Sequence, residues 1–178
     1  FHDLERLRAL GRGRLQLVFA GKAHPQDEGG KALIRHVYEM GARLGSDVKV
    51  VYLPGYGLEL ARLLVSGVDL WLNTPLRPLE ASGTSGMKAA HNGVPSFSVL
   101  DGWWLEGCVE GITGWSIGDE QPAASRREAD ESDAADLYDK LERVVLPTFR
   151  DRERWVAVMQ HCIALNASYF NTHRMVQQ

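Results

Sequence analysis

Apolar residues fall along the chain either in short apolar-rich runs or at helical spacing. The runs predict strands covered on both faces, since buried parallel strands are apolar throughout. These runs are Leu15–Ala20, Val48–Leu53, Leu70–Leu72, Ser96–Leu100 and Ile112–Ile117. The helical stripes are Gln26–Leu44, Leu58–Gly67 and, after a long loop, Thr84–His91. Alternating strands and helices indicate βαβ units, so we expect an α/β fold with a Rossmann-like, mostly parallel sheet and helices on both faces.

The C-terminal third begins with a polar, charged stretch at residues 121–133, which predicts an exposed loop. Two helices are expected within residues 134–170. Pro147 is expected to separate them, because proline interrupts a helix interior. With 178 residues the chain can bury one sizeable core, so residues 1–178 are expected to form a single domain.

Composition and charge narrow the classes of function. The net charge of −3 gives no basic excess for nucleic acid or an anionic membrane. No apolar stretch approaches the roughly 20 residues of a membrane-spanning helix. The two cysteines, Cys108 and Cys162, are too few for a disulfide framework, and the histidines have no metal-ligand spacing. We therefore expect a cytoplasmic, small-molecule-directed protein with no metal site.

The most informative stretch is Glu80 to Lys88, E-A-S-G-T-S-G-M-K, which follows a predicted strand and enters a helix. Ligands of open α/β sheets bind there, outside the carboxyl ends of the strands. Gly83 and Gly86 let backbone N–H groups approach a ligand. Thr84 or Ser85 is expected to cap a helix whose N-terminus stabilises an anion.

Lys88 falls about one turn inside that helix. A lysine beside a phosphate cradle is what a pyridoxal phosphate site requires. The residues alone leave an alternative open, in which Lys88 is an exposed lysine on an amphipathic helix that follows a turning loop.

The Glu80–Lys88 segment, with Asn92-Gly93 and Leu100-Asp101-Gly102 after it, resembles the pyridoxal phosphate segment of the α-glucan (glycogen and maltodextrin) phosphorylases. The string L-D-G-W-W-L-E-G and the earlier G-K-A-H-P-Q-D are similar to the bacterial and archaeal branch. The resemblance implies the C-terminal lobe of a glycosyltransferase B type fold. It also implies a fragment of a larger enzyme, which agrees with a start at Phe1 without Met and an end in a polar run.

Carried over by position, the resemblance makes Lys88 the lysine that bonds the cofactor aldehyde, and Lys88 and Glu80 the catalytic pair. The residues that it implies for cofactor binding are Lys88, Thr84, Gly83, Ser85, Gly86 and Tyr56. Those that it implies for contact with the glucosyl unit are Glu80, Ser82 and Gly83. Tyr56 has an alternative interpretation, a partly buried aromatic residue at a helix start.

Family members cleave terminal α-1,4-linked glucosyl residues of glycogen, starch or maltodextrin with inorganic phosphate and release α-glucose 1-phosphate. The cofactor's phosphate, not its ring, exchanges a proton with the substrate phosphate. The family's basic phosphate-binding residues and its N-terminal lobe lie outside this sequence, so the isolated fragment is expected to be inactive. Whether the larger enzyme forms a homo-oligomer is left open.

Two other functions are weighed. A nucleotide-sugar-dependent glucan synthase lobe shares the topology, but such enzymes commonly carry an acidic residue where Lys88 stands. A non-catalytic glucan-binding module is disfavoured by the intact Glu80–Lys88 segment. Trp103, Trp104 and Glu106 could form a sugar-stacking platform, although aromatic residues after a strand more often close a core, and we favour packing.

Overall fold

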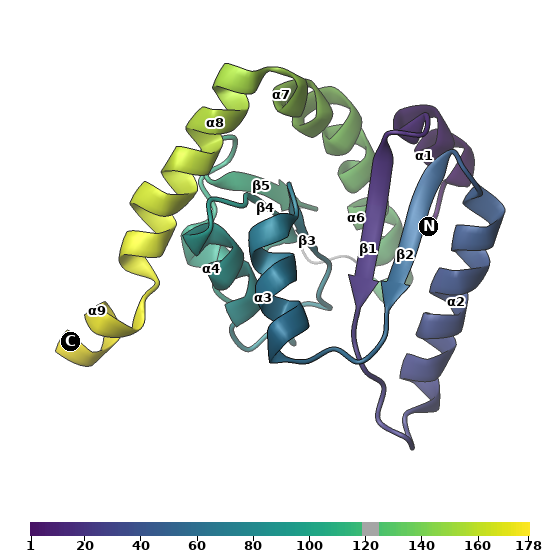
Figure 1. Cartoon of the computed structure of the whole chain (residues 1–178), viewed down its shortest axis with the longest axis horizontal. Helices are drawn as coiled ribbons and strands as arrows, with labels where there is room; N and C mark the ends of the chain where they lie inside the picture. Colours follow the sequence, from purple (N-terminus) through teal and green to yellow (C-terminus); the bar gives the residue numbers. More distant parts are fainter. Residues whose placement is uncertain (119–124) are drawn as a thin grey trace. The chain divides into compact units, whose positions relative to one another are not determined.

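The computed structural model describes residues 1–118 and 125–178 (Figure 1). These residues divide into two compact units, Phe1–Ala61 and Arg62–Gln178. Each unit has its own group of paired strands, and the expected single domain over residues 1–178 stays a prediction.

The first unit pairs two parallel strands and carries two helices. In chain order its elements are α1 (Leu4–Gly11), β1 (Leu15–Ala20), α2 (Glu28–Leu44) and β2 (Val48–Leu53). The strands pair with Leu15 opposite Val48, and α2 runs alongside β2 (Figure 1). The carboxylate of Asp27 starts α2 by accepting the amide of Gly30 at 2.8 Å. Both predicted strands are confirmed, whereas α1 was not expected.

The second unit is built on three parallel strands in the order β3-β4-β5, namely β3 (Trp71–Asn73), β4 (Ser96–Val99) and β5 (Gly114–Ile117). Helix α3 (Leu58–Gly67) precedes β3, and the division between the units falls within it. The other helices, two of them π-helical (η), are α4 (Thr84–His91), α5 (Trp104–Gly107), α6 (Arg126–Lys140), η1 (Leu141–Val145), α7 (Leu146–Arg150), α8 (Arg152–His161), η2 (Cys162–Ala167) and α9 (Thr172–Gln177). The predicted α/β class with parallel strands and flanking helices is confirmed.

An apolar core surrounds β4 and β5. All four residues of β4 are buried, as expected for a central parallel strand. The core residues with the largest side chains are Phe97, Trp103, Trp104, Trp115, Ile117 and Trp155. Trp104 is fully buried, and its indole N–H donates to the carbonyl of Trp115 at 3.3 Å. The preference for packing over sugar stacking at Trp103 and Trp104 is therefore confirmed.

Two expectations for the C-terminal third are wrong. Residues 121–124 lie outside the described part, but from Arg126 the expected loop is helix α6. Ser125 caps it by accepting the amide of Glu128 at 3.2 Å, and this Ser-x-x-Glu pattern is a helix-start signal within a polar stretch.

Pro147 also does not separate two helices. The helix continues to Arg150, because the π turn of η1 directly before the proline carries a wider bond, from the amide of Leu146 to the carbonyl of Leu141. The break comes at Asp151, whose carboxylate accepts the amide of Arg154 at 3.2 Å and starts α8.

Within residues 1–118 and 125–178, none of the helices combines the length and the apolar character needed to cross a membrane.

Candidate functional site

The Glu80–Lys88 segment lies at the carboxyl ends of β3 and β4. These strands are parallel neighbours, so the loops that follow them leave the sheet at the same edge. Asp101, after β4, accepts the backbone amide of Glu80 through Oδ2 at 2.9 Å. The amide of Trp103 donates to the carbonyl of Ser82 at 2.8 Å. Both bonds tie the loop after β3 to the loop after β4.

The two loops approach so closely that one of them requires glycine. Gly102 has a φ of +55°, and a Cβ there would lie 2.6 Å from the Ser82 carbonyl oxygen and 3.0 Å from Cγ of Glu80. Asp101 is buried and also accepts the amide of Gly102 through Oδ1 at 2.9 Å. The Asp101 carboxylate therefore fixes the backbone of both loops at this contact, at Glu80 and at Gly102.

Helix α4 begins with a glycine cap. Gly83 occupies the cap position with φ 84° and ψ 44°, and no side chain caps the helix, so the expectation that Thr84 or Ser85 does so is wrong. Both residues already lie in the first turn, where their own amides need acceptors. Among the described residues these two amides have no hydrogen-bond partner, whereas Gly86 N–H bonds to the Gly83 carbonyl at 3.1 Å. The positive end of α4 is thus free to meet an anion.

The start of α4 rests on the indole of Trp103. A Cβ on buried Gly86 would lie 2.7 Å from Trp103 Nε1, and one on Gly83 would lie 3.0 Å from Trp103 Cδ1. The indole is 5% exposed. Trp103 therefore supports the backbone of the segment from inside the core.

Lys88 is exposed, and it lies four residues after Thr84 on the same helical face. Helical side chains lean toward the N-terminus, so we expect the lysine chain to extend toward the amides of the first turn. Its amine has no ion pair or hydrogen bond to any described residue. Its backbone carbonyl accepts from Asn92 Nδ2 at 2.8 Å.

The structure brings most of the predicted residues together in the second unit: Glu80, Ser82, Gly83, Thr84, Ser85, Gly86 and Lys88. The Glu80 carboxylate and the Ser82 hydroxyl are half-buried and have no hydrogen-bond partner in the described part of the chain. Tyr56 belongs to the first unit, so its predicted contact with a cofactor stays a prediction.

Sequence reasoning assigned no role to two supports of this segment. Asp101 stood in the Leu100-Asp101-Gly102 string, and its place directly after a strand was the available signal. Arg77, in the same loop as Glu80, donates through one nitrogen to both carboxylate oxygens of Asp133 on α6, at 2.6 and 2.8 Å. No local pattern links these two residues, which are 56 positions apart.

Comparison with solved structures finds the fold again. A crystal structure of Anabaena Alr3699/HepE in complex with UDP-glucose matches 98% of this chain and 42% of its own, with a TM-score of 0.66 and 18% identity. At that identity the likeness shows the fold alone, and it agrees with the predicted glycosyltransferase B type lobe.

Comparison of sequences is more specific. Maltodextrin phosphorylase from Thermococcus litoralis is 46% identical over 99% of this chain, which spans 22% of that protein. Glycogen phosphorylase from Mycobacterium tuberculosis is 42% identical over 98% of the chain, which spans 21% of it. The sequence model of the carbohydrate phosphorylases matches residues 4–114. The chain therefore belongs to the carbohydrate phosphorylase family.

Proposed function

We propose that this chain is part of an α-glucan phosphorylase, in which the Glu80–Lys88 segment holds pyridoxal phosphate. The enzyme releases the terminal α-1,4-linked glucosyl unit of a glucan as glucose 1-phosphate with inorganic phosphate. The observation that carries the proposal is that the Lys88 amine lies one helical turn from the amides of Thr84 and Ser85, and that none of the three has a partner among the described residues. The names of the relatives, maltodextrin and glycogen phosphorylase, support the same reaction.

The residues present fit this cofactor at both of its ends. The first turn of α4 offers free N–H groups and the positive helix end to a phosphate, and Gly83 and Gly86 add no side chain that would block it. The Thr84 hydroxyl and the Ser85 backbone complete the phosphate contacts. Lys88 would hold the aldehyde end through its amine. When bound, the cofactor supplies a phosphate group that exchanges a proton with the substrate phosphate.

Glu80 and Ser82 have the groups needed to orient a sugar. The Glu80 carboxylate accepts hydrogen bonds from sugar hydroxyls, and the Ser82 hydroxyl both donates and accepts. Asp101 and Trp103 fix the backbone of these two residues, which limits the orientations that a bound glucosyl unit can take. A carboxylate beside the ring also stabilises positive charge that develops there during bond cleavage.

The chain spans about a fifth of the length of these relatives. We therefore propose that catalysis requires an N-terminal lobe of the same enzyme, which contributes glucan and phosphate contacts. The 178 residues alone are then not a catalyst. We also propose a cytoplasmic location, because the two widely separated cysteines fit a reducing compartment.

Assay of the full-length protein with maltodextrin tests the function. We expect glucose 1-phosphate to form only when inorganic phosphate is present, and Lys88→Ala to lower the rate at least about a hundredfold. Lys49→Arg, at an exposed position on β2, is the matched control and should keep the wild-type rate. An unchanged rate in Lys88→Ala would contradict the assignment of Lys88.

One observation favours a test of the alternative function, a nucleotide-sugar-dependent glucan synthase. The similar solved structure is a complex with UDP-glucose. Extension of maltodextrin from UDP-glucose, with no product from phosphate, would replace the phosphorylase proposal by a synthase. We expect no extension, because Lys88 stands where such enzymes commonly carry an acidic residue for the nucleotide ribose.

A further inference from the structure

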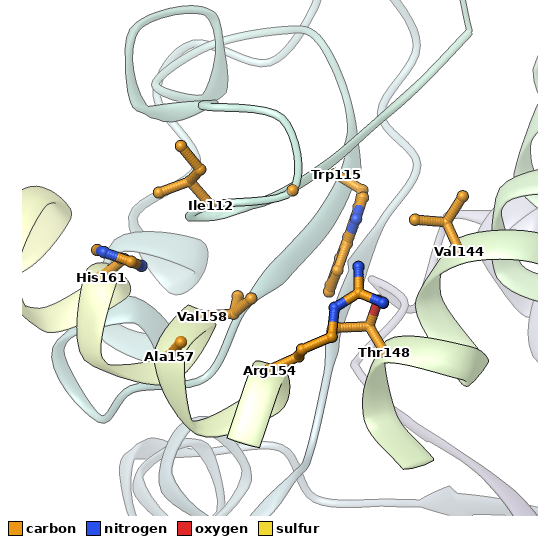
Figure 2. Close-up of a pocket in the computed structure, with 9 residues that line it drawn as sticks. Ile112, Trp115, Val144, Thr148, Arg154, Ala157, Val158 and His161 are labelled. Atoms are coloured by element: carbon orange, nitrogen blue, oxygen red, sulfur yellow. The ribbon is translucent and has the colours of Figure 1, made fainter. Parts of the chain in front are cut away.

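A pocket of about 210 Å³ opens in the second unit, and none of its lining residues belongs to the Glu80–Lys88 segment (Figure 2). It lies between the turn before β5, the η1–α7 helix and α8. The residues that define it are Ile112, Trp115, Val144, Thr148, Arg154 and His161. At about 30 Å³ per water molecule, this volume has room for a small organic molecule.

One residue that lines the pocket, Trp115, carries a donor with no partner among the described residues. Trp115 is 1% exposed, and its indole N–H has no hydrogen-bond partner among the described residues. An indole nitrogen only donates, so this buried group lacks the acceptor that it needs for a hydrogen bond. Figure 2 shows the ring edge-on between Ile112 and Val144.

The other polar groups of the pocket can also donate, and none of them has a partner in the part of the chain that the structure describes. The Thr148 hydroxyl and the side chains of Arg154 and His161 make no hydrogen bond or ion pair with the described residues. In Figure 2 the Arg154 guanidinium is directed toward Trp115 and Thr148. Among the described residues that line the pocket there is no aspartate or glutamate. A ligand for this set of groups is therefore an acceptor with negative charge.

The remaining walls are apolar. Ile112 comes from the turn before β5, Val144 from η1 and Val158 from α8, and in Figure 2 their side chains surround the same space. A π turn such as η1 is rare in helices and is found disproportionately at functional sites. Apolar walls with one cluster of donors suit a ligand that has an apolar body and a single charged group.

We propose that this pocket binds a small organic anion, a carboxylate on an apolar or aromatic body, at a site separate from the Glu80–Lys88 segment. The carboxylate lies between the Trp115 N–H and the Arg154 guanidinium, with the Thr148 hydroxyl as a further donor. The apolar body packs against Ile112, Val144 and Val158. A carboxylate suits the site better than a phosphate, because the one guanidinium that lines the pocket compensates one negative charge.

Calorimetric titration of the full-length protein with benzoate tests this site, with benzyl alcohol as the uncharged analogue of similar shape. We expect one benzoate per chain, bound at least about tenfold more tightly than benzyl alcohol. Arg154→Gln should weaken benzoate binding about tenfold and leave benzyl alcohol unchanged. Trp115→Phe should weaken benzoate binding about fivefold, because it keeps an aromatic side chain and removes the donor.

Arg152→Gln is the matched control, since Arg152 is exposed on the same helix and does not line the pocket. The absence of saturable benzoate binding would overturn the proposal, and so would binding that neither Arg154→Gln nor Trp115→Phe weakens. Arg154 is exposed, so its variant remains informative if Trp115→Phe fails to fold. The titration requires neither pyridoxal phosphate nor catalysis, so its outcome is independent of the proposed phosphorylase function.

Discussion

Gly86 is restricted by the indole on which α4 rests, since a Cβ there would lie 2.7 Å from Trp103 Nε1. Both groups are buried, so the added methyl must displace the helix start or the ring. We expect Gly86→Ala to lower the free energy of unfolding by about 1–3 kcal/mol in denaturant titrations. Gly67→Ala is the matched control in α3, because its Cβ meets nothing within 4 Å. An equal effect of the two substitutions would contradict this packing account.

The Asp101 carboxylate holds the amides of Glu80 and Gly102, so both of its oxygens must accept. Asp101→Asn places an amide donor opposite one of these N–H groups. We expect a loss of about 1–3 kcal/mol in stability, together with weaker cofactor binding by the full-length protein. Asp69→Asn, at an exposed position, should change neither quantity. Normal cofactor affinity in Asp101→Asn would show that Asp101 does not position the loop.

The thiols of Cys108 and Cys162 are expected to make the stability of the folded chain depend on pH. Burial raises the pKa of Cys162 from 9.0 to about 12, and burial followed by the nearby Glu110 raises the pKa of Cys108 to about 12. Between these values the folded chain keeps protons that the unfolded chain loses, so these thiols make stability fall as the pH rises above about 9.

The same shift should slow iodoacetamide alkylation at pH 8 by up to about a thousandfold relative to the denatured chain. Mass spectrometry of the folded and denatured protein measures both rates. Equal rates in the two states would contradict the assignment of buried, protonated thiols.

At the level of elements, α6 holds the loop that leads from β3 to Glu80. Arg77 and Asp133 are about one-quarter and one-fifth exposed, at 27% and 21%, so solvent weakens their pairing only in part. We expect Asp133→Asn to lower the free energy of unfolding by about 1–2 kcal/mol.

Arg127→Gln breaks the exposed Arg127–Glu131 pair on the same helix and should cost less than about 0.5 kcal/mol. Chemical denaturation of both variants compares the two pairs. A smaller effect at Asp133 than at Arg127 would contradict the proposed support of the loop.

The elements differ in how far their sequences predict them. Helix α4 has the bounds expected from Thr84–His91, because Gly83 and Asn92-Gly93 are strong local signals at its ends. The part of helix α6 before residue 134 was expected to be a loop because its residues are polar, although Ser125 and Glu128 marked the helix start. Continuation through Pro147 depends on a π turn, for which the sequence carries no recognisable pattern.

The candidate site could be predicted because its signals, like those at the ends of α4, are local in the sequence. The residues Glu80 to Lys88 are contiguous, so their composition and their place after a strand could be read directly. Support from Asp101, Trp103 and Asp133 depends on which strands are neighbours and on which helix packs near the loop. Such long-range pairings are properties of the folded chain.

The chain as a whole belongs to the carbohydrate phosphorylase family. It spans about a fifth of the length of its relatives. We expect the isolated 178 residues to produce no glucose 1-phosphate from maltodextrin and phosphate, because the proposed N-terminal lobe would supply part of the substrate contacts. Mixing this chain with the separately expressed remainder of the protein tests complementation. Turnover by the 178 residues alone would contradict this expectation.

The central claim is that Lys88 holds pyridoxal phosphate. The most direct measurement incubates the full-length protein with pyridoxal phosphate, fixes the cofactor with borohydride and maps the modified lysine by peptide mass spectrometry. We predict a label on Lys88 at near one equivalent, with little at the other lysines of this chain, Lys22, Lys31, Lys49 and Lys140. A label on those lysines with none on Lys88 would contradict the account.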